Sequence, residues 1–256
     1  FPFLAPDDWS LPTGDFPGAR DPVSYRQRLT QLVNAYRQDN QANPPQEVPF
    51  ITWGYHPLWH GDIDRNTLNR WFGDTPVLLW HRSFHEMIGN DAAWRRLGIT
   101  ETDAEAIHEA DWDRGHFWEG GLKAIVPKFD FLFEPQRFGQ GMANFLAMMH
   151  QAGVTTALDM GTGIFGDPMR EIQGIKAVAA NYPIPSRIIL TPIILDFIGR
   201  KQSPEQALAE VREWQQSNND RVQVGNHFKL MLDGAIFSGL SQMGPPGYLD
   251  GHHGVW

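Results

Sequence analysis

A lysine within an apolar run is the residue whose setting most suggests chemistry. In the stretch 228–234, Lys229 lies among phenylalanine, leucine and methionine, and the run ends in Asp233-Gly234, where a strand would hand over to a loop. A lysine buried in a strand is costly unless its amine is paired, modified or bound to a metal ion. The alternative is a side chain that reaches solvent or pairs with Asp233. Asp233 is a catalytic candidate, although capping of the loop is the favoured interpretation for it.

Histidine and tryptophan form the second feature. The chain has 10 of each, and most of both lie between Trp53 and Trp118. Taken singly, such a tryptophan usually fills a core and such a histidine lies on a loop. Together they are typical of an aromatic-walled cleft with polar groups, the usual composition of a small-molecule site. The expected cleft walls are Trp53, His56, Trp80 and Trp118.

One segment of this region alternates in a way that would group its histidines. If 77–85 is one extended strand, His81, Ser83 and His85 share a face. His85 could then hydrogen-bond a substrate carbonyl or leaving group, and a histidine held by the backbone is an equal alternative. The spacing of His81 and His85 could suggest zinc, but the helical His-Glu-x-x-His pattern is absent, so we do not expect zinc there.

Composition excludes several classes of protein. A chain of 256 residues with 41% hydrophobic and 20% charged residues is ordinary globular material, in one large domain or two ordinary ones. The net charge of −9, without clustered Lys and Arg, argues against nucleic-acid binding. No apolar run reaches the roughly 18 residues of a membrane helix. Without cysteine, a metal could be held only by His, carboxylate or modified Lys. The lack of cysteine and of a visible secretory signal fits a cytoplasmic protein.

The elements that must position these residues follow from periodicity. The first half is expected to hold a strand over 50–55 and helices over 22–38, 64–71, 90–97 and 135–151, with irregular chain at 1–22 and 40–48. The second half alternates strand and helix: strands over 154–160, 187–192 and 226–234, with helices near 167–181 and 205–216. Apolar strands alternating with amphipathic helices indicate parallel βα units.

Three such units cannot close a barrel of eight strands. The second half is therefore either a small open sheet or a piece of a barrel. Asp159 is expected at the carboxyl end of its strand, where barrel enzymes place functional groups.

Several segments, in order, resemble the amidohydrolase superfamily, specifically its amidohydrolase-3 branch of metal-dependent deacylase- and deformylase-like enzymes. The resemblance is carried by residues 53–56, 81–85, 90–93, 97–99, 115–119, 153–156, 229–234 and 246–250. It implies a (β/α)8 TIM-type barrel, of which residues 135–256 would form βα units two to four. Residues 1–134 would be an α/β insertion that covers the mouth of the active site.

The resemblance also implies a partial chain. The family's first-strand His-x-His pair does not occur in this sequence, and its later histidines and final aspartate would follow Trp256. The chain also starts without a methionine, so an N-terminal portion is expected to be missing. Lacking most of the metal ligands, this chain is expected to be inactive alone.

The activity implied by the resemblance is hydrolysis of an amide-type C–N bond, or an ester, of a small molecule. One or two divalent metal ions, with zinc expected, would lower the pKa of a bound water to about 7 and polarise the carbonyl. Lys229 resembles a lysine that some members carboxylate into a bridge between metals. The predicted catalytic residues are His85 and Asp233, the predicted metal ligand is Lys229, and the predicted substrate-binding residues are His56, His81, Asn90, Trp53, Trp80, Glu119 and Asp159.

Two other functions remain open. One is a non-catalytic α/β module that binds a small molecule in its aromatic cleft, folds alone and needs no metal. The other is a glycosidase-like hydrolase with paired carboxylates among Asp111, Asp113 and Glu119, although nothing in the sequence fixes their separation. The expected partner is a small-molecule substrate, with neither nucleic acid nor membrane. The oligomeric state, including a homo-oligomer, stays open.

Overall fold

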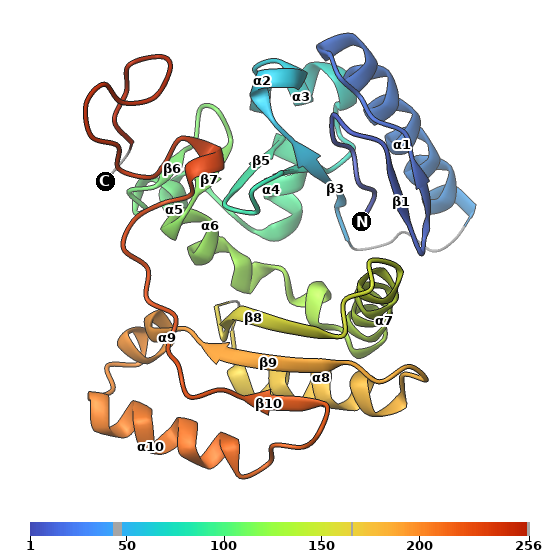
Figure 1. Cartoon of the computed structure of the whole chain (residues 1–256). Coiled ribbons are helices and arrows are strands. Elements are labelled where there is room, and N and C mark those ends of the chain that lie inside the picture. The colour runs from blue at the N-terminus through green and yellow to red at the C-terminus, as the bar shows by residue number, and fades with distance from the viewer. Residues whose placement is uncertain (43–47, 165, 255–256) are drawn as a thin grey trace. The chain divides into compact units, whose positions relative to one another are not determined.

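The structure is a computed structural model that describes residues 1–42, 48–164 and 166–254. The chain divides into two compact units: unit 1 comprises Phe1–Phe129 with Asp233–Trp256, and unit 2 comprises Asp130–Leu232 (Figure 1). Both units combine helices with a sheet, so the protein is α/β, as predicted. The domain boundary expected between residues 134 and 135 stays a prediction, and most of the irregular segment expected over 40–48 falls outside the described residues.

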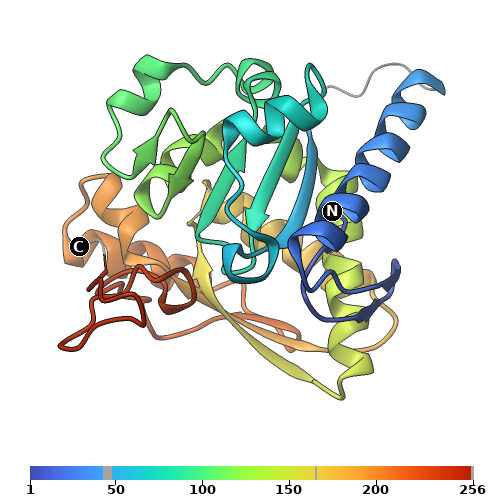
Figure 2. The same ribbon diagram turned by 90° about the horizontal axis from the view of Figure 1, so that it is seen from above.

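Unit 1 is built on a five-stranded sheet in the order β3-β4-β5-β7-β6, whose strands lie side by side in Figure 2. Strands β3 and β4 are parallel, and the other pairs are antiparallel. A separate hairpin near the N-terminus joins β1 (Trp9–Leu11) to β2 (Gly14–Phe16). The strands of the main sheet are β3 (Phe50–Tyr55), β4 (Val77–His81), β5 (Glu86–Gly89), β6 (Ala110–Asp111) and β7 (His116–Trp118).

The helices of unit 1 bury apolar side chains against this sheet. Leu29, Leu68 and Leu79, from two helices and a strand, are fully buried in one cluster. Asp64 caps α3 and Asn90 caps α4, so both predicted helix starts are confirmed. The helices are α1 (Pro22–Ala42), α2 (Pro57–His60), α3 (Arg65–Phe72), α4 (Asp91–Leu97), α5 (Glu101–Glu105) and α6 (Gly120–Ile125), with 3-10 turns η1 (Val126–Lys128) and η3 (Ile236–Ser238).

The single strand predicted over 77–85 was wrong. Strand β4 ends at His81, the chain reverses, and β5 starts at Glu86 antiparallel to it. Phe84 makes the reversal with a left-handed φ of 65°. His81 supports the turn, because its Nδ1 accepts a hydrogen bond from the Ser83 backbone N–H at 3.1 Å. Ser83 and His85 therefore lie in a turn and not on a strand face with His81.

Unit 2 contains three parallel strands in sequence order: β8 (Thr156–Thr162), β9 (Arg187–Pro192) and β10 (Val222–Val224). The predicted parallel βα pattern is thereby confirmed. One face of the sheet packs on the helices through residues such as Ile188 and Val222, whereas Leu158 and Met160 of β8 stay 54% and 46% exposed. The helices are α7 (Pro135–Gln151), α8 (Pro168–Asn181), α9 (Ile194–Gly199) and α10 (Pro204–Gln215), with the 3-10 turn η2 (Asp130–Phe133).

The third strand of unit 2 differs from the prediction. The strand is Val222–Val224, and the run 226–234 is irregular apart from one bridge between Lys229 and Ile193. Leu230 and Leu232 are 64% and 91% exposed, so the apolar character of the run does not come from burial in the sheet. Gly225 separates the run from the strand.

Among the described residues, no helix is both long and apolar enough to cross a membrane.

Candidate functional site

Histidines and glutamates gather at one edge of the sheet in unit 1, and we call this group the histidine cluster. The carboxyl ends of β3, β4 and β7 and the amino end of β5 meet at this edge, because β3 and β4 are parallel while β5 is antiparallel to β4 and β7. Each of these strands contributes a residue to the cluster or leads directly into one. The histidine cluster consists of His56, His81, His85, His116, Glu86 and Glu119.

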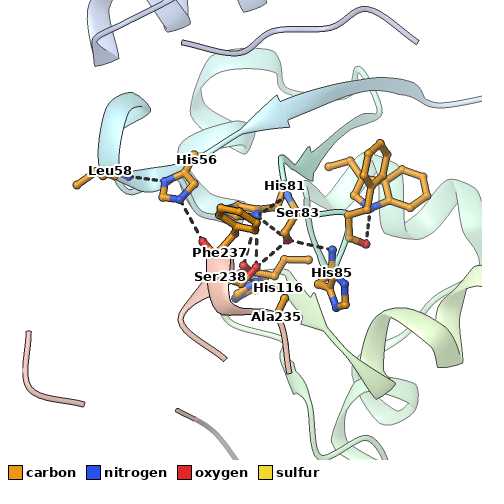
Figure 3. Close-up of polar contacts among 12 residues, drawn as sticks. His56, Leu58, His81, Ser83, His85, His116, Ala235, Phe237 and Ser238 are labelled. Atoms are coloured by element: carbon orange, nitrogen blue, oxygen red, sulfur yellow. Dashed lines mark hydrogen bonds and ion pairs between the residues drawn. The ribbon is translucent and has the colours of Figure 1, made fainter. Parts of the chain in front are cut away.

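His81 is buried at the centre of several polar contacts (Figure 3). Its Nδ1 lies 2.8 Å from Ser83 Oγ and 3.5 Å from Glu86 Oε1. A Ser-His-acid relay needs the serine and the acid on opposite ring nitrogens, and here both face Nδ1. Burial lowers the pKa of His81 to about 4, so its imidazole is neutral near pH 7.

Glu86 links two histidines. His116 Nε2 lies 2.8 Å from Glu86 Oε2, and the other oxygen faces His81. Burial by itself would raise the pKa of the Glu86 carboxyl. The hydrogen bond from His116 and the charges of His81 and His116 outweigh it, so this pKa lies below its ordinary value. Glu86 is therefore a carboxylate at neutral pH.

His85 and Glu119 form the second pair. His85 Nδ1 lies 2.9 Å from Glu119 Oε2, with the histidine side chain 38% exposed and the glutamate only 5% exposed. A carboxylate partner assigns the proton to Nδ1, which leaves the Nε2 lone pair available. In the described part of the chain, Nε2 has no hydrogen-bond partner. A half-exposed histidine with a fixed tautomer and an open nitrogen can take a proton from a bound molecule or give one to it.

The turn 235–238, which we call the capping turn, binds the cluster from a distant part of the sequence. The Ala235 N–H donates to Glu119 Oε1 at 2.8 Å, and Ser238 Oγ lies 2.7 Å from Ser83 Oγ. The Phe237 carbonyl lies 3.2 Å from His56 Nε2 (Figure 3). Burial lowers the pKa of His56, although the hydrogen bond to the Phe237 carbonyl acts in the opposite direction. Residues after 232 thus complete the site.

The structure brings together four of the predicted site residues: His56, His81, His85 and Glu119. Sequence reasoning assigned no site role to Ser83, Glu86, His116 or Ser238. Glu86 and His116 lie in the span rich in histidine and tryptophan, which was the available signal for them. Ser238 had none, because its partners are more than 150 residues away in the sequence.

The predicted tryptophan walls lie beneath the turn that carries Ser83 and His85. The Trp53 ring stacks on Phe84 with centroids 4.5 Å apart, and Trp80 Nε1 donates to the Phe84 carbonyl at 3.1 Å. The rings of His116 and Trp118 lie 5.0 Å apart. These aromatic rings therefore pack against the turn and against His116 of the histidine cluster.

Asn90 and Asp233 bind backbone groups of unit 1. Asn90 is fully buried: its oxygen accepts from the N–H groups of Val77 and Ala93, and its nitrogen donates to the carbonyls of Gly73 and Thr75. Asp233 accepts from the Gln242 N–H at 3.0 Å, as a turn cap does. A part in substrate binding or catalysis stays a prediction for both residues.

Lys229 and Asp159 belong to unit 2. The Lys229 N–H donates to the carbonyl of Pro192 at the end of β9, and its carbonyl accepts from the N–H of Ile194, the first residue of α9. The side chain of Lys229 is half-buried, and its ammonium has no partner within the described residues. Asp159 accepts from the Gly161 N–H and the Thr162 hydroxyl at a bulge in β8. The metal and substrate roles of these two residues stay predictions.

A metal ion finds no ready site in the described part of the chain. Nowhere among those residues do three or more His, Asp or Glu side chains gather in a way that could hold one. The contacts of the histidine cluster give the reason: Glu86 and Glu119 each use an oxygen for a histidine ring, so their acceptors are directed within the cluster. The residues present do not fit a complete metal centre.

Comparison with known proteins finds likeness in structure only. No family model matches the chain, and no curated protein matches it. The crystal structure of an uncharacterized metal-dependent hydrolase from Pyrococcus horikoshii is similar over 88% of this chain, with a TM-score of 0.52 and 14% identity. A second such hydrolase, from Pyrococcus furiosus, gives a TM-score of 0.49 at 13% identity over 85% of this chain. The chain spans 40% of the length of each. At this identity the first likeness shows a shared fold.

Proposed function

We propose that this chain is part of a metal-dependent hydrolase that cleaves amide-type C–N bonds, or esters, of a small molecule, with His85 as its acid-base group. The observation that carries the proposal is the His85–Glu119 pair, in which Nδ1 of a partly exposed histidine lies 2.9 Å from an oxygen of a buried glutamate, while Nε2 has no hydrogen-bond partner among the described residues. The description of the similar Pyrococcus horikoshii protein as a metal-dependent hydrolase supports the reaction class.

The topology of unit 2 supports the barrel part of the proposal. Its strands are neighbours in sequence order, and its helices pack on one face of the sheet. A doubly wound sheet has helices on both faces, whereas the wall of a (β/α)8 barrel has them on the outside only. On this proposal β8, β9 and β10 are barrel strands two to four, and Leu158 and Met160 face the barrel interior.

In the proposed reaction His85 moves one proton. Its Nε2 takes a proton from the attacking water as the water oxygen bonds to the substrate carbonyl carbon. It then gives that proton to the nitrogen, or ester oxygen, that leaves when the bond breaks. Because the described residues do not fit a complete metal centre, a metal would need ligands in addition to Lys229, and no step is assigned to it.

The test uses the full-length protein that contains this chain, with N-formyl and N-acetyl amines and the matching esters as substrates. We expect hydrolysis that is lost on chelation, and a fall in kcat/KM of about 100-fold or more for His85→Gln. His108→Gln is the matched control, because His108 is an exposed histidine of the same unit outside the cluster. Equal losses in the two variants would contradict the role of His85.

One outcome would favour the non-catalytic alternative. If the full-length protein binds these small molecules but hydrolyses none of them with zinc, manganese or cobalt added, the hydrolase proposal fails. A non-catalytic binding module would then remain as the function of the chain.

A further inference from the structure

We infer that Glu119 is a positioning residue for His85, whose carboxylate fixes the tautomer and orientation of the imidazole from a strained backbone turn. The functional meaning of that position rests on the proposed function, but the geometry is a property of unit 1 alone. Three observations carry it: the backbone conformation of Glu119, the close packing that enforces this conformation, and the two separate uses of its carboxylate oxygens.

The backbone at Glu119 is in a conformation that side chains other than glycine rarely adopt. It joins β7 to α6 with φ 43° and ψ −113°. Such a conformation is strained, and it persists only where its surroundings enforce it, most often at functional sites. Phe84, next to His85, also has a positive φ. A positive φ therefore occurs at Glu119 itself and at the residue before His85.

Close packing next to Glu119 enforces the turn. A Cβ on Gly121 would lie 1.9 Å from the Glu109 carbonyl oxygen, and a Cβ on Gly120 would lie 2.8 Å from Glu109 Oε2. The two glycines therefore let the chain pass against Glu109, and the Trp118 N–H donates to the Glu109 carbonyl at 3.1 Å. The position of Glu119 is set by backbone contacts before its side chain makes any bond.

Glu119 is joined to His85 twice. Its backbone N–H donates to the His85 carbonyl at 2.9 Å, and its Oε2 accepts from the His85 ring at 2.9 Å. The other oxygen accepts from the Ala235 N–H. The carboxylate thus needs two acceptor oxygens at once, one for the imidazole and one for the capping turn.

This double use separates positioning from a merely structural role. A glutamine at 119 has one acceptor oxygen and one NH₂ group. If its oxygen keeps the Ala235 N–H, its NH₂ faces His85 Nδ1, which must then accept, so the ring proton moves to Nε2. A residue that only anchors the capping turn would be replaced by glutamine without any change at the imidazole.

The primary experiment is imidazole ¹⁵N NMR on the chain at a pH where His85 is neutral, with the His85 signals assigned by their loss in His85→Gln. We expect the Nδ1–H tautomer in the unmodified chain and in Glu119→Asp, and the Nε2–H tautomer in Glu119→Gln. Glu105→Gln, an exposed glutamate of the same unit, should leave the signals unchanged. An Nε2–H tautomer in the unmodified chain overturns the inference, even if Glu119→Gln does not fold.

Kinetics on the full-length protein separate this inference from the proposed function. We expect Glu119→Gln to lower kcat by about 10- to 100-fold, with KM changed less than twofold and activity partly restored in Glu119→Asp. A tautomer change without loss of activity would support positioning and contradict catalysis by His85. A loss of activity with the Nδ1–H tautomer retained would overturn positioning.

Discussion

His81 shows what burial does to a single side chain of the cluster. Its ring is desolvated between Ser83, Glu86 and His56, and its pKa falls to about 4. A histidine whose pKa is lower in the folded than in the unfolded state takes up a proton more readily on unfolding. Its contribution to stability is therefore complete above about pH 6.5 and is lost as the pH falls toward 4.

We expect this loss to reach about 3 kcal/mol for His81 by pH 4. His81→Asn should remove most of it, because the asparagine oxygen can replace Nδ1 as the acceptor of the Ser83 N–H without taking up a proton. Urea unfolding at pH 7 and pH 4.5 gives the change in the free energy of unfolding between these pH values, which is compared between the variant and the unmodified chain. The exposed His108→Asn serves as control, and an identical acid loss in all three proteins would refute the prediction.

The contribution of Glu171, in unit 2, to folding stability depends on pH with the opposite sign. Burial raises the pKa of its carboxyl to about 7 despite a hydrogen bond from the Gly163 N–H, and nearby Asp159 adds to the rise. The protonated form is favoured by folding, so the stability is complete below about pH 4.5 and is lost as the pH rises through 7.

For Glu171 the predicted loss between pH 5 and pH 8 is about 2.5 kcal/mol. Glu171→Gln keeps an acceptor for Gly163 and cannot ionise, so it should be more stable than the unmodified chain at pH 8 and about equal to it at pH 5. Urea unfolding at both pH values gives the two differences. If the free energies of unfolding of the variant and the unmodified chain differ by the same amount at both pH values, Glu171 does not titrate in this range.

Some of the site could not be read from residue types. The turn 82–85 contains neither glycine nor asparagine, the residues that favour a positive φ, and no proline, which favours turns by fixing φ near −65°, so continuation of the strand was the better local prediction. The reversal is stabilised instead by the His81 side chain, by the Trp80 contact with the Phe84 carbonyl and by Ser238. Two of these contacts are local, but their geometry has no signature in the sequence.

At the level of elements, helix starts were the best-predicted features, because capping is local. Helices were expected from residues 64, 90 and 205, and the side chains of Asp64, Asn90 and Ser203 each accept a backbone N–H at the start of these helices. Strand β10 was missed because three residues give almost no pattern. The apolar run around Lys229 was taken for that strand, although its leucines are exposed.

Two helical glycines should respond to alanine in opposite directions. Gly121 lies in the first turn of α6, where alanine would clash with the Glu109 carbonyl, and we expect a loss of about 3 kcal/mol. Gly141 lies exposed in α7 with no atom within 4 Å of an added Cβ, so alanine should stabilise by about 0.5–1 kcal/mol. Denaturant unfolding of the two variants measures both. If both alanine variants were more stable than the unmodified chain, the higher helix propensity of alanine would outweigh the close packing at Gly121.

At the level of the whole molecule, the two compact units are interleaved in the sequence. Residues 233–256 belong with residues 1–129, and unit 2 lies between them in the sequence. The contacts that return the last segment to unit 1 are hydrogen bonds such as Ala235 to Glu119 and Ser238 to Ser83. Single bonds over such sequence distances leave no periodic pattern, so the return could not be predicted.

Limited digestion should reveal this organisation. Leu230 and Leu232 are exposed in irregular chain, so thermolysin, which cleaves before large apolar residues, is expected to cut there early. The released C-terminal peptide should stay associated with the remainder through its bonds to His56, Ser83 and Glu119. Mass spectrometry identifies the cut, and gel filtration tests the association. Immediate loss of the peptide would contradict the assignment of 233–256 to unit 1.

The interleaved order has a consequence for synthesis on the ribosome. Unit 2 is continuous in sequence, so it can acquire its structure as soon as residue 232 has left the exit tunnel. Unit 1 has to wait, since Glu119 and Ser83 lack their hydrogen-bonding partners Ala235 and Ser238 until these residues emerge. Translation that stops soon after residue 232 would therefore yield a complete unit 2 and a unit 1 that lacks its last segment.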